Sequence, residues 1–128
     1  QKPGGGLIRP KILVVTNNKK VLETYPNQVQ FIEGSVLDVF LQCEQLLKEG
    51  YDLVTHPLSG NLQVSKTPFK SVVLERSNEN VQPKSLELIR LCIEKVKEGQ
   101  PISYPDAVLE DFAFLDLELI KEPLEELL

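Results

Sequence analysis

Side chains with hydrogen-bonding or acid–base chemistry gather in three short turns of the 128-residue chain. Each turn directly follows a run of residues that predicts a β-strand. Asparagine amides donate to ligands, backbone N–H groups at a helix start attract anions, and histidine exchanges protons near neutral pH. Together with one lysine of a later loop, these turns supply the candidate ligand-binding residues, which are Thr16, Asn17, Asn18, Glu33, Gly34, Ser35, Thr55, His56, Ser59, Gly60 and Lys70.

The first two turns also have simpler structural interpretations. Asn17 and Asn18 would form an ordinary turn, because asparagine tolerates unusual backbone angles and bonds to its own backbone. Ser35 after Gly34 would be the N-cap of a helix, and such caps are common. Glu33 would repel an anion bound at that helix start. Ligand contact and plain turn structure therefore both stay open for these residues.

His56 is the only histidine and the one candidate catalytic residue. It follows an expected strand directly before Pro57, where it would act as a general acid or base or donate to a ligand carbonyl. The alternative is a packed histidine whose hydrogen bonds fix the loop. Ser59 lies three residues away, but no Gly-x-Ser-x-Gly sequence surrounds it, which argues against a nucleophilic hydrolase.

Cationic side chains occur in the loop expected between Leu58 and Lys70. Lys66, Thr67 and Lys70 would meet an anion if this loop closed as a lid. The alternative is that these lysines are simply solvated, as is usual in exposed loops. No Gly-x-Gly-x-x-Gly sequence follows the first strand and there is no P-loop, so no nucleotide or other cofactor is expected.

Hydrophobic periodicity predicts the elements that position these turns. An apolar run at Lys11–Thr16 is typical of a central strand buried on both faces. The helix after Ser35, with Asp38 as a capping-box partner, ends at Gly50, and a second long helix runs from Pro83 to Gly99. The other expected elements are strands at Gln28–Glu33, Tyr51–Thr55 and Phe69–Glu75 and short helices at Lys19–Thr24 and Asp106–Phe112. From Ala113 onward the sequence fits both periods.

Strands that alternate with helices predict an α/β fold with helices on both faces of the sheet. We expect a small, Rossmann-like three-layer α/β/α sandwich with a four-stranded, mainly parallel sheet in the order 2-1-3-4. In this order the three polar turns converge at the carboxyl ends of the strands, where open α/β sheets bind their ligands.

Composition restricts the class of protein. The chain has 14 Lys and Arg against 19 Asp and Glu and is 41% hydrophobic, which is typical of one globular domain. We expect that domain at residues 11–128, behind a flexible leader at residues 1–10. No apolar run approaches the about 20 residues of a membrane span. The separated Cys43 and Cys92 are typical of free thiols in a cytoplasmic protein and give no metal-ligand spacing.

The negative charge is concentrated at one end. Residues 106–128 hold eight acids and one lysine, whereas residues 1–105 hold 13 basic and 11 acidic residues. The formal net charge of −5 therefore argues against nucleic acid and anionic membranes as partners, but not against an anionic ligand at the strand ends. The acidic segment is a candidate docking element, and an exposed apolar tail of Leu124, Leu127 and Leu128 would pair two subunits in a homodimer.

Several blocks of the chain resemble the GrdX family from about Ile12 to Ile120. THPLSG, at Thr55–Gly60, and the pattern EGS-x-x-DV, at Glu33–Val39, are fairly specific. The blocks are ILVVTNN (Ile12–Asn18), FIEGSVLDV (Phe31–Val39), LVTHPLSG (Leu53–Gly60), TPFKSVV (Thr67–Val73), KSLEL (Lys84–Leu88) and VLEDFAFLDLEL (Val108–Leu119).

The resemblance implies a metabolic setting. GrdX proteins are associated with gene clusters for the glycine, sarcosine and betaine reductases of amino-acid-fermenting anaerobes, systems that use selenoproteins and thioredoxin and yield acetyl phosphate. The resemblance supplies no catalytic residues. It places its matching blocks on the same strand ends that the expected geometry brings together.

Three functions follow as hypotheses. The first is a cytoplasmic accessory protein that binds a small anionic or amide-bearing ligand at the strand ends. The second is a small enzyme acting on acyl or phosphoryl groups with His56 as acid or base. The third is an interaction module whose acidic tail docks a component of a glycine or betaine reductase.

Overall fold

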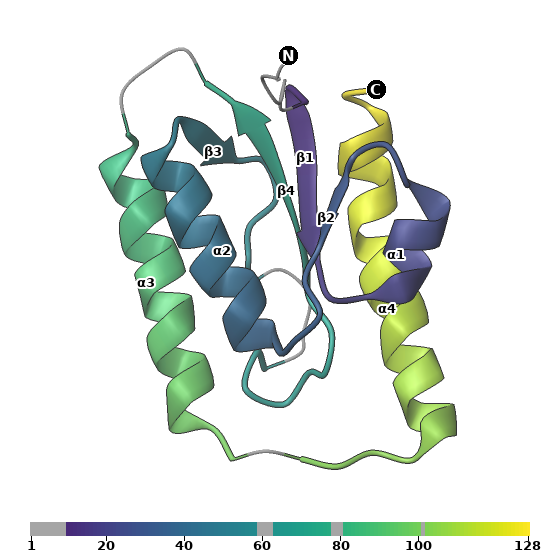
Figure 1. Cartoon of the computed structure of the whole chain (residues 1–128). Coiled ribbons are helices and arrows are strands. Elements are labelled where there is room, and N and C mark those ends of the chain that lie inside the picture. Colours follow the sequence, from purple (N-terminus) through teal and green to yellow (C-terminus); the bar gives the residue numbers. More distant parts are fainter. Residues whose placement is uncertain (1–9, 59–62, 78–80, 101) are drawn as a thin grey trace.

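A four-stranded sheet lies between two pairs of helices in the computed structural model, which describes residues 10–58, 63–77, 81–100 and 102–128 (Figure 1). The expected leader falls almost wholly outside these residues. The elements are β1 (Ile12–Thr16), α1 (Lys19–Thr24), β2 (Val29–Phe31), α2 (Val36–Lys48), β3 (Tyr51–Leu53), β4 (Ser71–Arg76), α3 (Pro83–Glu98) and α4 (Asp106–Glu125). The mixed α/β class is confirmed.

The expected strand order and direction are wrong. The strands lie in the order β2-β1-β4-β3; β1 and β2 are parallel, whereas β4 is antiparallel to both of its neighbours. A parallel neighbour requires a crossover, usually a helix, and the described residues between β3 and β4 contain none. The chain therefore returns in the opposite direction and β4 enters between β1 and β3. The sheet is mixed and not a mainly parallel, Rossmann-like one.

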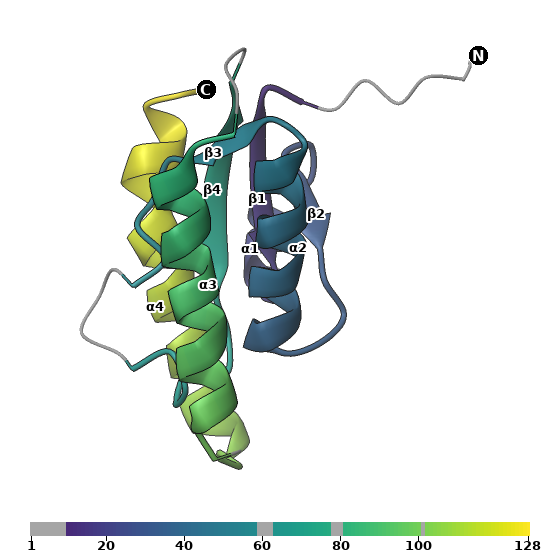
Figure 2. The ribbon, with the colours of Figure 1, turned by 90° about the vertical axis from the view of Figure 1, so that its left-hand side faces the viewer.

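Alternation along β1 and β4 divides the core into two clusters. Leu13 and Val15 point to the face covered by α2 and α3, while Ile12 and Val14 point to the face covered by α1 and α4. Figure 2 shows α2 and α3 side by side in front of the strands with α4 behind them. Both faces of the two central strands are thus buried, as the apolar run of β1 predicts; the expected strand order places β4 at an edge of the sheet instead.

The ends of α2 follow from local chemistry. Ser35 accepts a hydrogen bond from the backbone N–H of Asp38, and the Asp38 carboxylate accepts one from the Ser35 N–H, so the expected capping box is confirmed. At the other end, Gly50 has φ of 106°, a left-handed conformation that glycine adopts without a Cβ clash. The helix is fixed at both ends by residues within three positions of it.

The carboxyl-terminal segment is a single helix, so the short helix expected to end at Phe112 is wrong in length. Ala113, Asp116, Ile120 and Leu124 are its buried residues, at spacings of three and four that match a helix face. Leu124 is fully buried, in contrast to the expected exposed tail, whereas Leu127 and Leu128 are exposed. Burial of this helix face against the sheet favours a helix over the β-strand with which the alternating leucines were also compatible.

Candidate functional site

Six polar residues are buried where β1 ends and β4 begins, and they form what we call the polar cluster. They come from three parts of the chain: the end of β1 with the turn after it, the start of β4, and the middle of α4. The residues are Thr16, Asn17, Asn18, Lys70, Ser71 and Asp116. Buried polar groups are costly unless they are hydrogen-bonded, so their partners decide what the cluster does.

Asp116 connects α4 to the two central strands. One carboxylate oxygen accepts from the Ser71 backbone N–H at 2.9 Å, and the other accepts from the Ser71 hydroxyl at 2.6 Å. The Ser71 hydroxyl also lies 2.7 Å from the Thr16 hydroxyl, across the β1–β4 pair. Hydrogen bonds to a charged group are the stronger ones, so this contact anchors α4 to the sheet.

Asn18 begins α1 and also reaches α4. Its side-chain oxygen accepts from the Lys20 N–H and caps the helix. Its amide nitrogen donates to the Ala113 carbonyl at 2.8 Å and to the Asp116 carboxylate at 3.1 Å. All of these partners belong to the protein itself, so Asn18 acts here as a structural connector.

Asn17 joins three segments at the same end of the sheet. Its amide nitrogen donates to the carbonyls of Gly34 and Pro68, at 3.1 and 3.0 Å, and its oxygen accepts from the Lys70 N–H at 3.0 Å. The turn before α2 and the segment before β4 are therefore held to the end of β1. The described residues contain no buried side-chain nitrogen or oxygen without a hydrogen bond.

Burial acts on the two charged members of the cluster in opposite senses. It raises the pKa of the Asp116 carboxyl, although hydrogen bonds from Ser71 and Asn18 oppose the shift. It lowers the pKa of the Lys70 ammonium, and attraction to Asp116 opposes that shift. Desolvation is the larger cause in both groups, so burial disfavours the charged form of each.

Two members of the cluster, Ser71 and Asp116, were not among the sequence candidates. Asp116 carries a signal that points to it: it lies between Ala113 and Ile120, at helical spacings of three and four residues, on the buried face of α4. A carboxylate on the buried face of a helix requires hydrogen-bonding partners, and the polar turns are where the sequence offers them. Ser71 carries no comparable signal.

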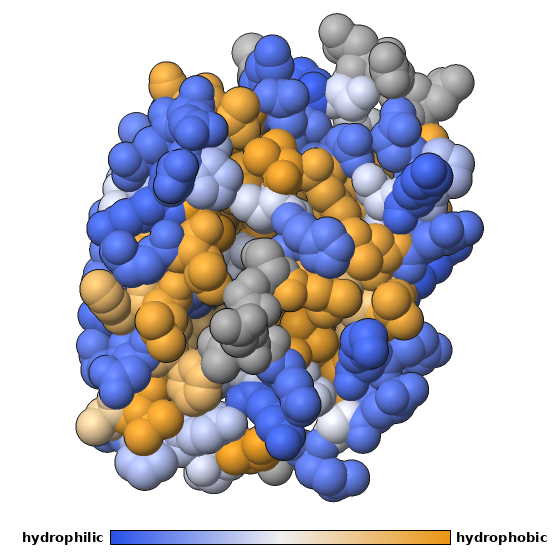
Figure 3. Space-filling model, turned by 180° about the vertical axis from the view of Figure 1, so that it is seen from behind, coloured by the Kyte–Doolittle hydropathy of each residue, from blue (hydrophilic) through white to orange (hydrophobic). Residues whose placement is uncertain are grey.

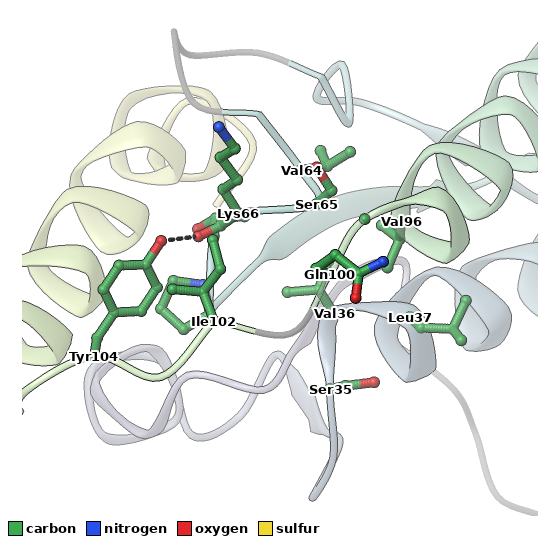
Figure 4. A pocket seen from close by; sticks show the side chains of 13 residues that line it. Ser35, Val36, Leu37, Val64, Ser65, Lys66, Val96, Gln100, Ile102 and Tyr104 are labelled. Carbon is green, nitrogen blue, oxygen red and sulfur yellow. Dashed lines mark hydrogen bonds between the residues drawn. The ribbon is translucent and has the colours of Figure 1, made fainter.

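A cavity of about 340 Å³, which we call the hollow, opens beside the start of α2 (Figure 4). Its walls come from the first residues of α2, the segment 64–68 before β4, and the chain from the end of α3 to Tyr104. The lining side chains labelled in Figure 4 are those of Ser35, Val36, Leu37, Val64, Ser65, Lys66, Val96, Gln100, Ile102 and Tyr104. Asn17 lies next to this site, because it fixes Gly34 and Pro68.

Close backbone contacts shape the walls of the hollow. A Cβ atom added to Gly99 would lie 2.3 Å from the Ser65 Cβ, so only glycine allows the end of α3 to approach segment 64–68 this closely. On the opposite wall, the Tyr104 hydroxyl donates to the Lys66 carbonyl at 2.7 Å (Figure 4). The hollow therefore has defined walls rather than loose loops.

The polar groups around the hollow differ in whether they are available to bind a ligand. Asp38 occupies the helix start that the sequence offered to an anion, since its carboxylate accepts from the Ser35 N–H and hydroxyl. In the described part of the chain, neither the Gln100 amide nor the Lys66 ammonium forms a hydrogen bond. The ammonium lies at the rim and points away from Ser35 (Figure 4). The described lining contains no carboxylate.

His56 lies apart from the hollow. It is exposed and lines a separate cavity of about 250 Å³ together with Val54, Lys84 and Ser85. Its Nδ1 accepts from the Leu58 N–H at 3.1 Å, and this fixes the ring. Because β4 lies between β1 and β3, the turn after β3 does not join the end of β1 as the expected strand order required.

The remaining candidates divide between the two places. Thr55 accepts a hydrogen bond from the Val73 N–H and so continues the β3–β4 pairing. Glu33 is exposed before the α2 cap, the Gly34 carbonyl accepts from Asn17, and Ser35 lines the hollow. Lys70 lies in the polar cluster. Ser59 and Gly60 lie outside the described residues.

The described residues also bear on metal sites and membrane spans. No group of three or more histidine, cysteine, aspartate or glutamate side chains is arranged there to hold a metal ion. None of the helices described is both long enough and apolar enough to cross a membrane. Cys43 and Cys92 are free and buried, and burial raises the pKa of the Cys92 thiol to about 11.

Comparison with known proteins identifies a family. Residues 13–125, nearly the whole chain, match the model of a protein family described as GrdX-like protein. No curated protein and no solved structure matches the chain.

Proposed function

Because the chain belongs to the GrdX-like family, we propose that it is a cytoplasmic accessory protein of glycine, sarcosine or betaine reductase metabolism that binds a small ligand in the hollow. The observation that carries this proposal is a walled cavity beside the carboxyl end of the parallel pair β1 and β2. Open α/β sheets bind ligands at this end of their parallel strands.

The size of the hollow supports a small ligand. Ligand cavities in proteins range over roughly 300–1,000 Å³, and the hollow, at about 340 Å³, lies at the lower limit. Its lining combines apolar side chains, such as Val36 and Val96, with a few polar groups, a combination that buries a ligand and fixes its orientation.

The charge of the lining supports an anionic or amide-bearing ligand. Lys66 at the rim supplies one positive charge to a carboxylate or phosphate, and Gln100 offers an amide donor and acceptor. The absence of a carboxylate from the described lining removes one source of repulsion. Asp38 and Glu33 lie nearby, so the anionic end of the ligand belongs at the Lys66 side of the hollow and not at the helix start.

Thermal unfolding and calorimetric titration with glycine, sarcosine, betaine and acetyl phosphate test this proposal. A ligand at 100 times its dissociation constant stabilises the folded state by about 2.7 kcal/mol, which raises the melting temperature measurably. We expect at least one of these compounds to give such a shift. If none of them shifts the wild-type protein, the proposed ligand class is wrong.

Binding measurements on variants show which cavity holds the ligand. Gln100→Ala should weaken binding roughly fivefold, and Lys66→Ala about tenfold for an anion, because each removes one hydrogen-bonding partner. His56→Ala is the matched control, since His56 is exposed and lines a different cavity. Loss of binding in His56→Ala with full binding in Gln100→Ala and Lys66→Ala would move the site to the turn after β3.

A further inference from the structure

Helix α4 carries an apolar stripe that the fold leaves unpaired. Val108, Phe112, Leu115 and Leu119 follow at spacings of four, three and four residues, which places them on one side of the helix. Leu115 is 51% exposed and Leu119 is 43% exposed, in the middle of the helix. Val108 and Phe112 are half-buried, and the Phe112 ring contacts the Tyr104 ring at a centroid distance of 5.0 Å.

The contacts of α4 show where this stripe points. On the α1 side, Lys20 forms an ion pair with Glu110 at 2.9 Å, and the Tyr25 hydroxyl donates to Glu125 at 2.5 Å. Helix geometry puts the stripe on the opposite side of the helix from Glu110 and roughly a third of a turn away from Glu125. The view from behind shows apolar side chains across the middle of that face, on the α4 side and on the α3 side alike, bordered by hydrophilic ones (Figure 3).

Exposed acids border the stripe on its solvent side. Asp111, Glu118 and Glu122 are exposed and lie next to it on the helix surface, at spacings of seven and four residues. The segment from Asp106 onward holds eight acids against the single base Lys121, and Lys121 pairs with Glu118 within the helix. The surface is thus apolar along a line and negative beside it.

We propose that this stripe is a docking surface for a cationic amphipathic helix of a partner protein. Leucine-like side chains of the partner would pack on Leu115 and Leu119, and its lysines or arginines would face Asp111 and Glu122. Residues Val108 to Leu119 span roughly 17 Å at 1.5 Å per residue, which is about three turns of a facing helix. The hollow is lined by other residues, one of which, Tyr104, contacts Phe112 of the stripe.

Charge decides against a second copy of the chain as the occupant. Pairing two α4 helices along their stripes would bring two acidic borders together, and like charges across an interface are repulsive. A cationic partner removes this repulsion and gains from complementary charge. An anionic membrane surface is disfavoured for the same reason.

Titration of a labelled synthetic peptide of leucine and lysine, about 18 residues long with one apolar face, tests the proposal. We expect saturable binding, followed by fluorescence anisotropy, that weakens with salt and perturbs the α4 amide signals in NMR spectra. The double variant Leu115→Ser/Leu119→Ser should weaken binding about tenfold or more, and Asp111→Lys/Glu122→Lys should weaken it to a similar extent. Leu91→Ser, an exposed leucine on α3, is the matched control.

Other outcomes overturn the proposal. Equal binding of a scrambled peptide of the same composition, or unchanged binding by the Leu115→Ser/Leu119→Ser variant, would show that α4 does not recognise an amphipathic helix. Sedimentation that shows a dimer abolished by the same two substitutions would assign the stripe to a second copy. Because His56→Ala and Gln100→Ala leave α4 unchanged, these variants should bind the peptide like wild type.

Discussion

The two faces of the sheet are closed by different means. On the α2/α3 face the buried residues are almost all apolar, and the large cluster includes Phe40, Leu46 and Ile89 at 0% exposure. On the α1/α4 face the apolar cluster is smaller, and polar contacts join its helices to the strands through Asn18 and Asp116. Apolar contact is non-directional, whereas each hydrogen bond needs one geometry. We infer that the first face supplies most of the stability and that the polar cluster fixes the position of α4.

The largest expected effect tests the apolar face. Phe40→Ala should lower the free energy of unfolding by about 4 kcal/mol, because it removes a fully buried ring and leaves a cavity. Urea denaturation followed by far-UV circular dichroism measures it. Leu41→Ala, the exposed neighbour on α2, is the control and should change stability by less than about 1 kcal/mol. Similar losses for both variants would contradict the assignment of this face as the main core.

The next effect tests the polar cluster. Asp116→Ala should cost about 3 kcal/mol, because Ser71 and Asn18 lose a buried charged acceptor. Hydrogen exchange should show the amides of α4 losing more protection than those of α2. Glu118→Ala, an exposed acid on the same helix, is the control. Equal loss of protection in α2 and α4 would mean that the cluster does not act on α4 selectively.

A smaller effect compares local with long-range polar contacts. Ser35→Ala should cost about 1 kcal/mol, because it removes the side-chain half of the α2 capping box. Denaturant unfolding measures the loss, with Ser103→Ala, an exposed serine outside any helix, as the control. A cost equal to that of Asp116→Ala would remove the distinction between a local cap and a cluster that joins distant segments.

The last test is the pH dependence of stability, in which the change of the unfolding free energy with pH is measured. Burial raises the pKa of the Asp116 carboxyl, so the folded protein keeps this proton to higher pH than the unfolded chain does. Its contribution is complete below the ordinary carboxyl pKa of about 3.9 and is lost as the pH rises through the raised pKa. The unfolding free energy of wild type minus that of Asp116→Asn should therefore decrease from pH 4 to pH 7. A constant or increasing difference would contradict burial as the dominant cause.

Much of the local structure followed from the sequence. The helix Lys19–Thr24, the cap at Ser35 and the glycine that ends α2 are confirmed because each depends on residues only a few positions apart. Asn17 and Asn18 were predicted either to donate to a ligand or to form an ordinary turn. Their partners were not, since the bond from Asn18 to Asp116 joins residues 98 positions apart and no periodic pattern records such a pairing. The hollow was missed for a similar reason, because three separate segments form it.

The sequence by itself determined the element types, most of their ends, the concentration of acid after Asp106 and the family that the chain belongs to. These follow from local backbone preferences and from residue identity. Tertiary structure alone decided that β4 runs antiparallel between β1 and β3, which separates His56 from Asn17, and that the chain from Asp106 is one helix. Both outcomes depend on which surfaces meet: a strand joins the neighbour that completes its hydrogen bonds, and α4 forms where the sheet buries one side of it.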